Sequence, residues 1–103
     1  TPNRADCLSV LGVAREVAKH NVTVNNLLPG DFDTERHQSN TRAMAKVQNR
    51  PYEEMRSIRI AQVAAGRFGT PAEFGEYCAY LCSTQASFIT GQIVSVSGGL
   101  TMA

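Results

Sequence analysis

The feature that most constrains this chain is an apolar run that leads into a proline–glycine turn and then to a threonine. The run covers residues 22–28, the turn is Pro29–Gly30, and Thr34 stands four residues beyond the glycine. Short apolar runs of this kind are typical of strands in parallel sheets that are covered on both faces. A strand that ends in a sharp turn presents backbone groups and short polar side chains where open α/β sheets bind ligands.

The rest of the chain predicts an alternation of helices and strands. Apolar side chains recur at helical spacing in the first twenty residues and again after Thr70, and a second short apolar run lies near the end of the chain. The sequence therefore predicts helices over residues 4–19, about 40–49, 52–64 and 71–83, with Pro51 separating the middle pair, and strands over residues 22–28 and 92–96. Two strands joined through helices predict an α/β fold with a right-handed parallel crossover.

Two helices carry particular signals. Val10, Val13, Ala14 and Val17 follow the i, i+3, i+4, i+7 pattern within an apolar stripe that is wider than a surface helix needs. A sheet on one side and another subunit on the other would cover such a stripe. Gly12 in the same helix marks either a close approach of backbones or a tolerated interruption.

The helix over residues 71–83 has a complete starting signal. Thr70 is a good N-cap, Pro71 occupies the first helical position, and Glu73 completes a capping box with Thr70. We therefore expect the segment from Arg67 to Glu73 to serve helix initiation rather than catalysis.

Two short parallel strands cannot stand alone, because both faces and both edges of the pair need cover. The chain is therefore expected to be part of a larger doubly wound sheet. An assembly in which several copies complete one another's sheets is the alternative.

Composition argues against several classes of protein. The 10 Lys and Arg residues nearly balance the 9 Asp and Glu residues, which argues against nucleic-acid or membrane-surface binding. No apolar run approaches the roughly 20 residues of a spanning helix, and no apolar leader precedes residue 4. Three cysteines in apolar surroundings are typical of reduced thiols, so we expect a cytoplasmic protein without a metal site.

Three motifs together resemble one family. Besides the turn at Pro29–Gly30, they are Gly66–Phe74 and the stretch from Ile89 through Gln92 to Ser97-Gly98-Gly99. Across residues 4–99 the chain resembles the C-terminal part of the short-chain dehydrogenases/reductases. The resemblance implies the C-terminal part of a Rossmann-like, doubly wound parallel sheet. Residues 1–103 would then belong to a single domain whose N-terminal, dinucleotide-binding half is absent, and residues 35–65 would form a lid over the substrate.

The resemblance also implies an activity and a partner. Family members transfer a hydride between NAD or NADP and a small carbonyl or alcohol substrate, and 3-oxoacyl compounds are one candidate class. A homodimer or homotetramer is expected. Family members usually carry aspartate where this chain has Ser97, which puts any ion pair at that position in doubt.

Four residues would contact the cofactor by resemblance. Pro29 and Gly30 would shape the wall beneath the nicotinamide ring, and the backbone of Phe32 would contact the carboxamide. The hydroxyl of Thr34 would bind the carboxamide or a phosphate oxygen, although Thr34 is also a candidate N-cap for the next helix. Asp31 and Asp33 are expected to be solvated turn residues.

The catalytic groups of the family are not found in this chain. The glycine-rich phosphate loop is missing, no tyrosine precedes Tyr52, and no lysine precedes Lys19, so the Tyr-x-x-x-Lys pair has no counterpart. We expect the chain alone to be inactive. Its parent is either a divergent enzyme or a catalytically silent scaffold that assembles with active subunits.

The predicted lid is basic. Seven of the ten basic residues lie between Arg36 and Arg67, against only Glu53 and Glu54. This excess either attracts an anionic substrate or forms an ordinary solvated face.

Overall fold

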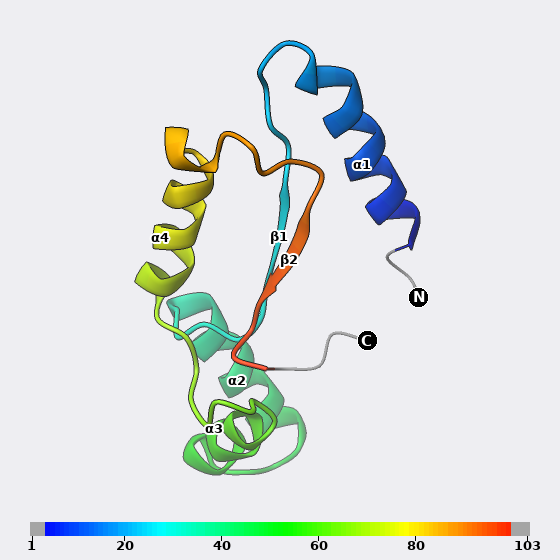
Figure 1. Ribbon diagram of the computed structural model, residues 1–103. Coiled ribbons are helices and arrows are strands. Elements are labelled where there is room, and N and C mark those ends of the chain that lie inside the picture. The colour runs from blue at the N-terminus through cyan, green and yellow to red at the C-terminus, as the bar shows by residue number, and fades with distance from the viewer. Residues whose placement is uncertain (1–3, 100–103) are drawn as a thin grey trace. The chain divides into compact units, whose positions relative to one another are not determined.

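The computed structural model describes residues 4–99, with side chains from Ser9 onward (Figure 1). Its elements follow one another as helix, strand, three helices, a short 3₁₀ turn and a strand. In chain order they are α1 (Arg4–Ala18), β1 (Asn26–Pro29), α2 (Glu35–Val47), α3 (Tyr52–Ala61), α4 (Pro71–Leu81), η1 (Thr84–Ala86) and β2 (Ile93–Val96).

The two strands pair in parallel, as the sequence predicts. The N–H of Asn26 donates to the carbonyl of Gln92 at 2.8 Å, and the N–H of Gly30 donates to that of Val96 at 2.9 Å. Both partners advance by four residues in the same direction, which is the mark of a parallel ladder. The α/β class with a parallel strand pair is therefore confirmed.

Strand β1 begins later than predicted because side chains hold the preceding residues. The Asn25 amide donates to the carbonyl of Ile89 at 3.1 Å and accepts from the N–H of Gln92 at 3.1 Å. The N–H of Val24 donates to the Thr90 hydroxyl at 3.0 Å. Side-chain bonds of this kind compete with the ladder, so regular pairing starts only at Asn26.

The chain divides into two compact units, and the division falls inside both strands and inside α4. The first unit comprises residues 4–28 and 75–95 of the described chain, and the second comprises residues 29–74 and 96–99.

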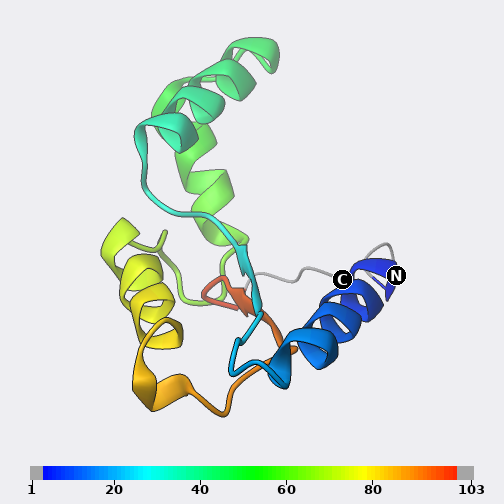
Figure 2. The ribbon, with the colours of Figure 1, turned by 90° about the horizontal axis from the view of Figure 1, so that it is seen from above.

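Within the first unit, α1 and the end of α4 lie on either side of the strand pair (Figures 1 and 2). A Cβ added at Gly91 would lie 3.2 Å from the Leu11 side chain of α1. Among the residues of this unit whose side chains the structure describes, Ala14 and Ala86 are each 1% exposed, while most strand side chains are half-buried. Such a small core is what a strand pair from a larger sheet would show.

Within the second unit, α2 and α3 pack against each other. The side chain that α3 buries between them is Met55. On α2 the buried residues are His37, Thr41 and Ala45, spaced four apart. Because this buried stripe is largely polar, apolar periodicity places the start of α2 near residue 40, five residues too late.

Helix α4 begins as predicted. The N–H of Thr70 donates to the Glu73 carboxylate at 2.8 Å, and the N–H of Glu73 donates to the Thr70 hydroxyl at 3.4 Å. The two bonds form the expected capping box. The apolar stripe of this helix is only partly covered, since none of its residues is fully buried.

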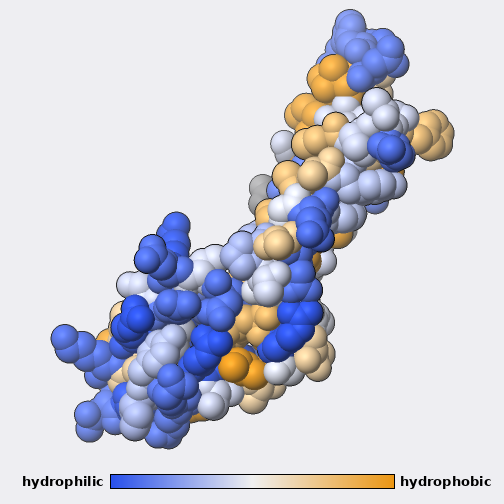
Figure 3. Space-filling view, turned by 90° about the vertical axis from the view of Figure 1, so that its left-hand side faces the viewer, coloured by the Kyte–Doolittle hydropathy of each residue, from blue (hydrophilic) through white to orange (hydrophobic). Residues whose placement is uncertain are grey.

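Hydrophilic residues gather over the α2–α3 pair, as Figure 3 shows. Large apolar side chains are also exposed, including Val13 of α1, Val47 of α2 and Phe88. None of the described helices is long and apolar enough to cross a membrane.

Gly30 should resist substitution. A Cβ at this position would lie 2.8 Å from both Cα and Cβ of Ser97, so Gly30→Ala should destabilise the fold by about 1–3 kcal/mol through overpacking. Gly12→Ala is the matched control, because a Cβ there meets nothing within 4 Å and should stabilise α1 by about 1 kcal/mol. Denaturant unfolding of both variants measures the difference, and equal midpoints would contradict the steric argument.

Candidate functional site

The four predicted cofactor residues line one groove in the second unit. The groove has a volume of about 420 Å³ and opens to solvent. Its wall, called here the turn groove, consists of Pro29, Gly30, Asp31, Phe32, Thr34, Arg36, His37, Asn40 and Arg59. The structure thus brings Pro29, Gly30, Phe32 and Thr34 together.

The turn itself is a close contact between backbones. The N–H of Gly30 continues the strand ladder to Val96, and the α-carbon of Gly30 faces Ser97 with no room for a side chain. Glycine is the residue that permits such an approach. At Gly30 the groove wall is therefore main chain without a side chain.

Phe32 is held by an isolated parallel bridge to Gly69. The carbonyl of Asp31 accepts from the N–H of Gly69 at 3.0 Å, and the N–H of Asp33 donates to the carbonyl of Gly69 at 2.8 Å. The amide N–H of Phe32 itself makes no hydrogen bond within residues 4–99. Its ring packs edge-on against Phe74 at 5.5 Å between centroids. The N–H of Phe32, a residue of the groove wall, is therefore available as a donor.

Thr34 caps α2. Its hydroxyl oxygen accepts from the N–H of His37 at 3.2 Å. A hydroxyl can donate and accept at once, so the cap leaves the Thr34 proton for a ligand. The two roles that the sequence left open are compatible.

The carboxylates of Asp31 and Asp33 are ion-paired, which differs from the expected solvated turn. Arg56 donates two hydrogen bonds to Asp33, at 3.1 and 3.3 Å, and Gln38 donates a third at 3.2 Å. Arg59 donates to Asp31 at 3.3 Å. Two acidic residues at alternate positions and two arginines three apart on one helix are the sequence signal that could have indicated this pairing.

The ion pair between Arg56 and Asp33 shifts the pKa values of both groups in the expected directions. The hydrogen bonds from Arg56, and secondarily from Gln38, lower the pKa of Asp33 below 3.8. The same bond to Asp33 raises the pKa of Arg56. Arg56 also lies over the Phe68 ring, 4.9 Å from its centroid, which fixes the guanidinium between loop and core.

His37 is a site residue that the sequence analysis missed. It is 9% exposed, packs edge-on against Phe68 with centroids 4.4 Å apart, and neither ring nitrogen has a hydrogen-bond partner. Its Nε2 lies 3.2 Å from the Asp31 carboxylate, a contact by distance without hydrogen-bond geometry. A lone histidine in a polar run carries no sequence signal for this placement.

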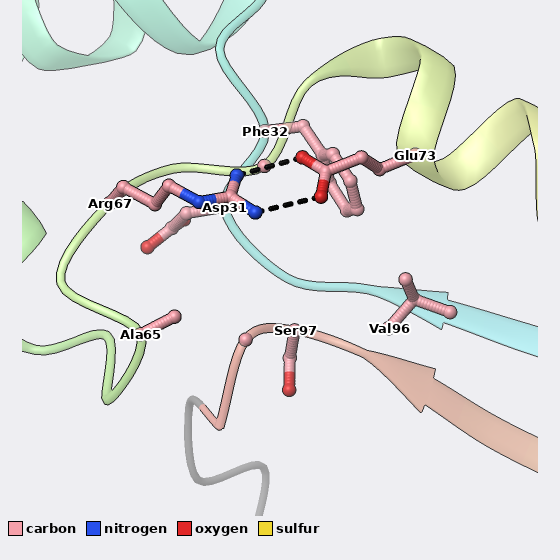
Figure 4. Close-up of a pocket in the computed structure, with 9 residues that line it drawn as sticks. Asp31, Phe32, Ala65, Arg67, Glu73, Val96 and Ser97 are labelled. Atoms are coloured by element: carbon pink, nitrogen blue, oxygen red, sulfur yellow. Dashed lines mark hydrogen bonds and ion pairs between the residues drawn. The ribbon is translucent and has the colours of Figure 1, made fainter.

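A second, smaller hollow of about 80 Å³ lies beside the capping box. Figure 4 shows the guanidinium of Arg67 facing the carboxylate of Glu73, with Ala65 and Ser97 also lining the space. Both hydrogen bonds of this pair measure 2.8 Å. Because these charged groups satisfy each other, the segment serves helix initiation, in line with the sequence analysis.

Ion pairs also neutralise much of the excess positive charge of the predicted lid. Arg50, Arg56, Arg59 and Arg67 pair with Glu54, Asp33, Asp31 and Glu73 respectively. Arg42 lies over the Tyr52 ring at 5.4 Å. The segment is therefore a weaker attractor of anions than its composition indicates.

The turn groove combines a main-chain wall at Gly30 with two donors, the N–H of Phe32 and the hydroxyl of Thr34, and could hold a flat ring that carries a polar group. The buried and unpartnered nitrogens of His37 lie in the same wall.

Comparison with known proteins places the chain in a family. Residues 7–101 match the family model described as enoyl-(acyl carrier protein) reductase. The chain belongs to the short-chain dehydrogenase/reductase family. Its curated relatives include the 3-oxoacyl-[acyl-carrier-protein] reductase FabG of Vibrio cholerae, 41% identical over 90 residues, and MabA of Mycobacterium bovis, 37% identical over 90 residues. Each match covers 87% of this chain and 32% of the relative, so the chain spans about a third of their length.

Solved short-chain dehydrogenase/reductase structures share the fold. A family member from Francisella tularensis superposes with a TM-score of 0.87 at 24% identity, over 96% of this chain and 41% of that one. YwfH, an NADPH-dependent reductase of bacilysin biosynthesis, superposes with a TM-score of 0.85 at 29% identity, over 98% and 38%. The chain therefore corresponds to part of a Rossmann-like domain.

The Glu73 carboxyl should stay ionised in acid. The paired Arg67 guanidinium, helped by the N–H of Thr70, lowers the pKa of Glu73 from 4.5 to about 2. A lowered folded-state pKa means that the stabilisation exists above pH 4.5 and is lost as the pH falls towards 2. NMR titration of the carboxyl carbon should show no protonation at about pH 3.5. In Arg67→Gln the midpoint should move up towards 4.5, and an unchanged midpoint would contradict the role of Arg67.

Proposed function

We propose that this chain forms the nicotinamide-facing wall of an NAD(P)-dependent short-chain dehydrogenase/reductase. The proposal rests on one observation: Pro29, Gly30, Phe32 and Thr34 line the same groove. Within it, the N–H of Phe32 and the hydroxyl proton of Thr34 are available as donors. A bound nicotinamide would supply hydride exchange with a carbonyl or alcohol. The family membership and the names of its relatives, which are reductases, support this reaction class.

Each residue has a limited task. The main chain at Pro29–Gly30 supports one face of the ring and keeps water from it. The N–H of Phe32 and the hydroxyl of Thr34 donate to the carboxamide, which fixes the rotation of the ring. Residues 35–65, which contain α2 and α3, form a lid over the substrate.

The substrate class follows from the relatives. FabG of Vibrio cholerae and MabA of Mycobacterium bovis are named as 3-oxoacyl-[acyl-carrier-protein] reductases, so a 3-oxoacyl compound is the first substrate to test. The cofactor is NAD or NADP, and the Actinorhodin ketoreductase structure, 29% identical to this chain, was solved with NADPH.

Oligomerisation is part of the same proposal. Leu11 and Val13 of α1 are 38% and 49% exposed, which fits an interface in a homodimer or homotetramer in the cytoplasm. A catalytically silent scaffold is the second candidate.

The 103-residue chain by itself should bind cofactor poorly. It holds one wall of the site and lacks the glycine-rich loop that anchors the pyrophosphate. Titration of the purified chain with NADH and NADPH should give dissociation constants well above the micromolar range, and a micromolar value would overturn this expectation.

A chimera tests the wall directly. The matching 90 residues of the Vibrio cholerae reductase are replaced by those of this chain, and NADPH binding and reduction of a 3-oxoacyl thioester are measured. Thr34→Gly removes the hydroxyl while glycine remains tolerated at the N-cap, so the dissociation constant should rise about fivefold for one lost hydrogen bond.

Ser39→Ala removes an exposed hydroxyl from α2 that does not line the groove, and it should change nothing. Equal binding by the Thr34 and Ser39 variants would contradict the proposed wall. A chimera that binds NADPH without turnover would favour the scaffold.

A further inference from the structure

Two arginines of α3 form ion pairs with one side of the loop that lines the turn groove. Asp31 and Asp33 alternate with Phe32 along an extended segment, so their carboxylates project to the side opposite its ring. Both carboxylates meet α3, where Arg56 and Arg59 stand three residues apart on one face. We call Asp31 with Arg59 and His37 the inner clamp, and Asp33 with Arg56 the outer clamp.

The two clamps differ in burial. The side chains of Asp31, Arg59 and His37 are 17%, 16% and 10% exposed, whereas those of Asp33 and Arg56 are 37% and 26% exposed. Removing one partner of a buried pair leaves an uncompensated charge, while an exposed pair contributes little. The inner clamp should therefore dominate the position of the loop.

The inner clamp also ties the loop to both lid helices. Arg59 of α3 donates to Asp31 at 3.3 Å and to the hydroxyl of Thr41 at 2.9 Å. Thr41 is 1% exposed and donates in turn to the carbonyl of His37. One guanidinium thus joins the loop, α2 and α3.

The inner clamp is itself part of the groove wall. Asp31, His37 and Arg59 line the turn groove, whereas Asp33 and Arg56 do not. A shift of Asp31 would move the neighbouring backbone of Phe32 and break the bridge to Gly69, whose N–H is bonded to the Asp31 carbonyl.

We propose that Arg59, acting through Asp31, is a positioning residue that shapes the turn groove before any ligand binds. The inner clamp presets the N–H of Phe32 and the hydroxyl of Thr34, so a ligand meets an ordered wall and no ordering cost is added on binding. The outer clamp is accessory. This inference rests on the proposed function only for the identity of the ligand.

Hydrogen exchange of the Gly69 amide tests the positioning without a cofactor. Asp31→Asn and Arg59→Met break the inner clamp, and Asp33→Asn and Arg56→Met make the same changes in the outer clamp. Gly69 exchange should speed up about tenfold or more in the first two variants and less than about threefold in the others. Equal effects, or a larger effect from the outer clamp, would overturn the proposal.

The Gly91 amide, bonded to the carbonyl of Val24 in the other unit, reports on global unfolding. If exchange of the Gly91 amide speeds up together with that of the Gly69 amide, the variant Arg59→Lys separates a local effect from global unfolding. A lysine keeps the charge beside Asp31 but lacks the fork that also reaches Thr41. Selective acceleration of Gly69 in Arg59→Lys supports the proposal, and equal acceleration of both amides overturns it.

NADPH binding by the chimera separates this inference from the proposed function. Asp31→Asn should weaken binding about tenfold and Asp33→Asn should leave it within about twofold. If hydrogen exchange at Gly69 shows the expected difference between the two clamps but the unsubstituted chimera does not bind NADPH, the proposed function fails and the positioning role stands. If it binds NADPH and both variants bind equally well, the positioning role is overturned.

Discussion

The structure depends on the parallel pairing of β1 with β2 and on its continuation into the turn. The Gly30–Val96 hydrogen bond extends the ladder past the end of β1, and the contact with Ser97 leaves no space for a side chain at Gly30. This contact fixes where the following loop begins, and hence where Phe32 and Thr34 lie. The candidate site is in this sense an extension of the sheet rather than an appended loop.

Local signals in the sequence predict much of the fold. The capping box at Thr70 and Glu73 sets the start of α4, and the two apolar runs correctly predict parallel strands. The start of α2 could not be predicted from periodicity, because its buried face carries His37 and Thr41 in place of apolar side chains. The delayed start of β1 could not be predicted either, because it depends on hydrogen bonds between the Asn25 amide and partners 64 and 67 residues away.

The candidate site, like the fold, could be predicted only in part. Pro29, Gly30, Phe32 and Thr34 were named from resemblance, and the structure gathers them in one groove. The ion pairs around them were not predicted, because Asp31 and Asp33 meet arginines more than twenty residues away and only the matching spacing of the two acidic and two basic residues indicated them. Ion pairs of this kind turn an apparent basic excess into a largely neutral scaffold that gives the loop its shape.

The small core of the first unit has a consequence for handling the protein. Within residues 4–99 the sheet has two strands, so each has an outer edge of main-chain groups with no further strand beside it. Bare edges of this kind template the addition of strands from other molecules. Half-buried strand faces and a fully exposed Phe88 add apolar surface to that tendency. Concentrated samples of the isolated polypeptide should therefore self-associate through β-sheet extension, and dilute conditions should keep it dispersed.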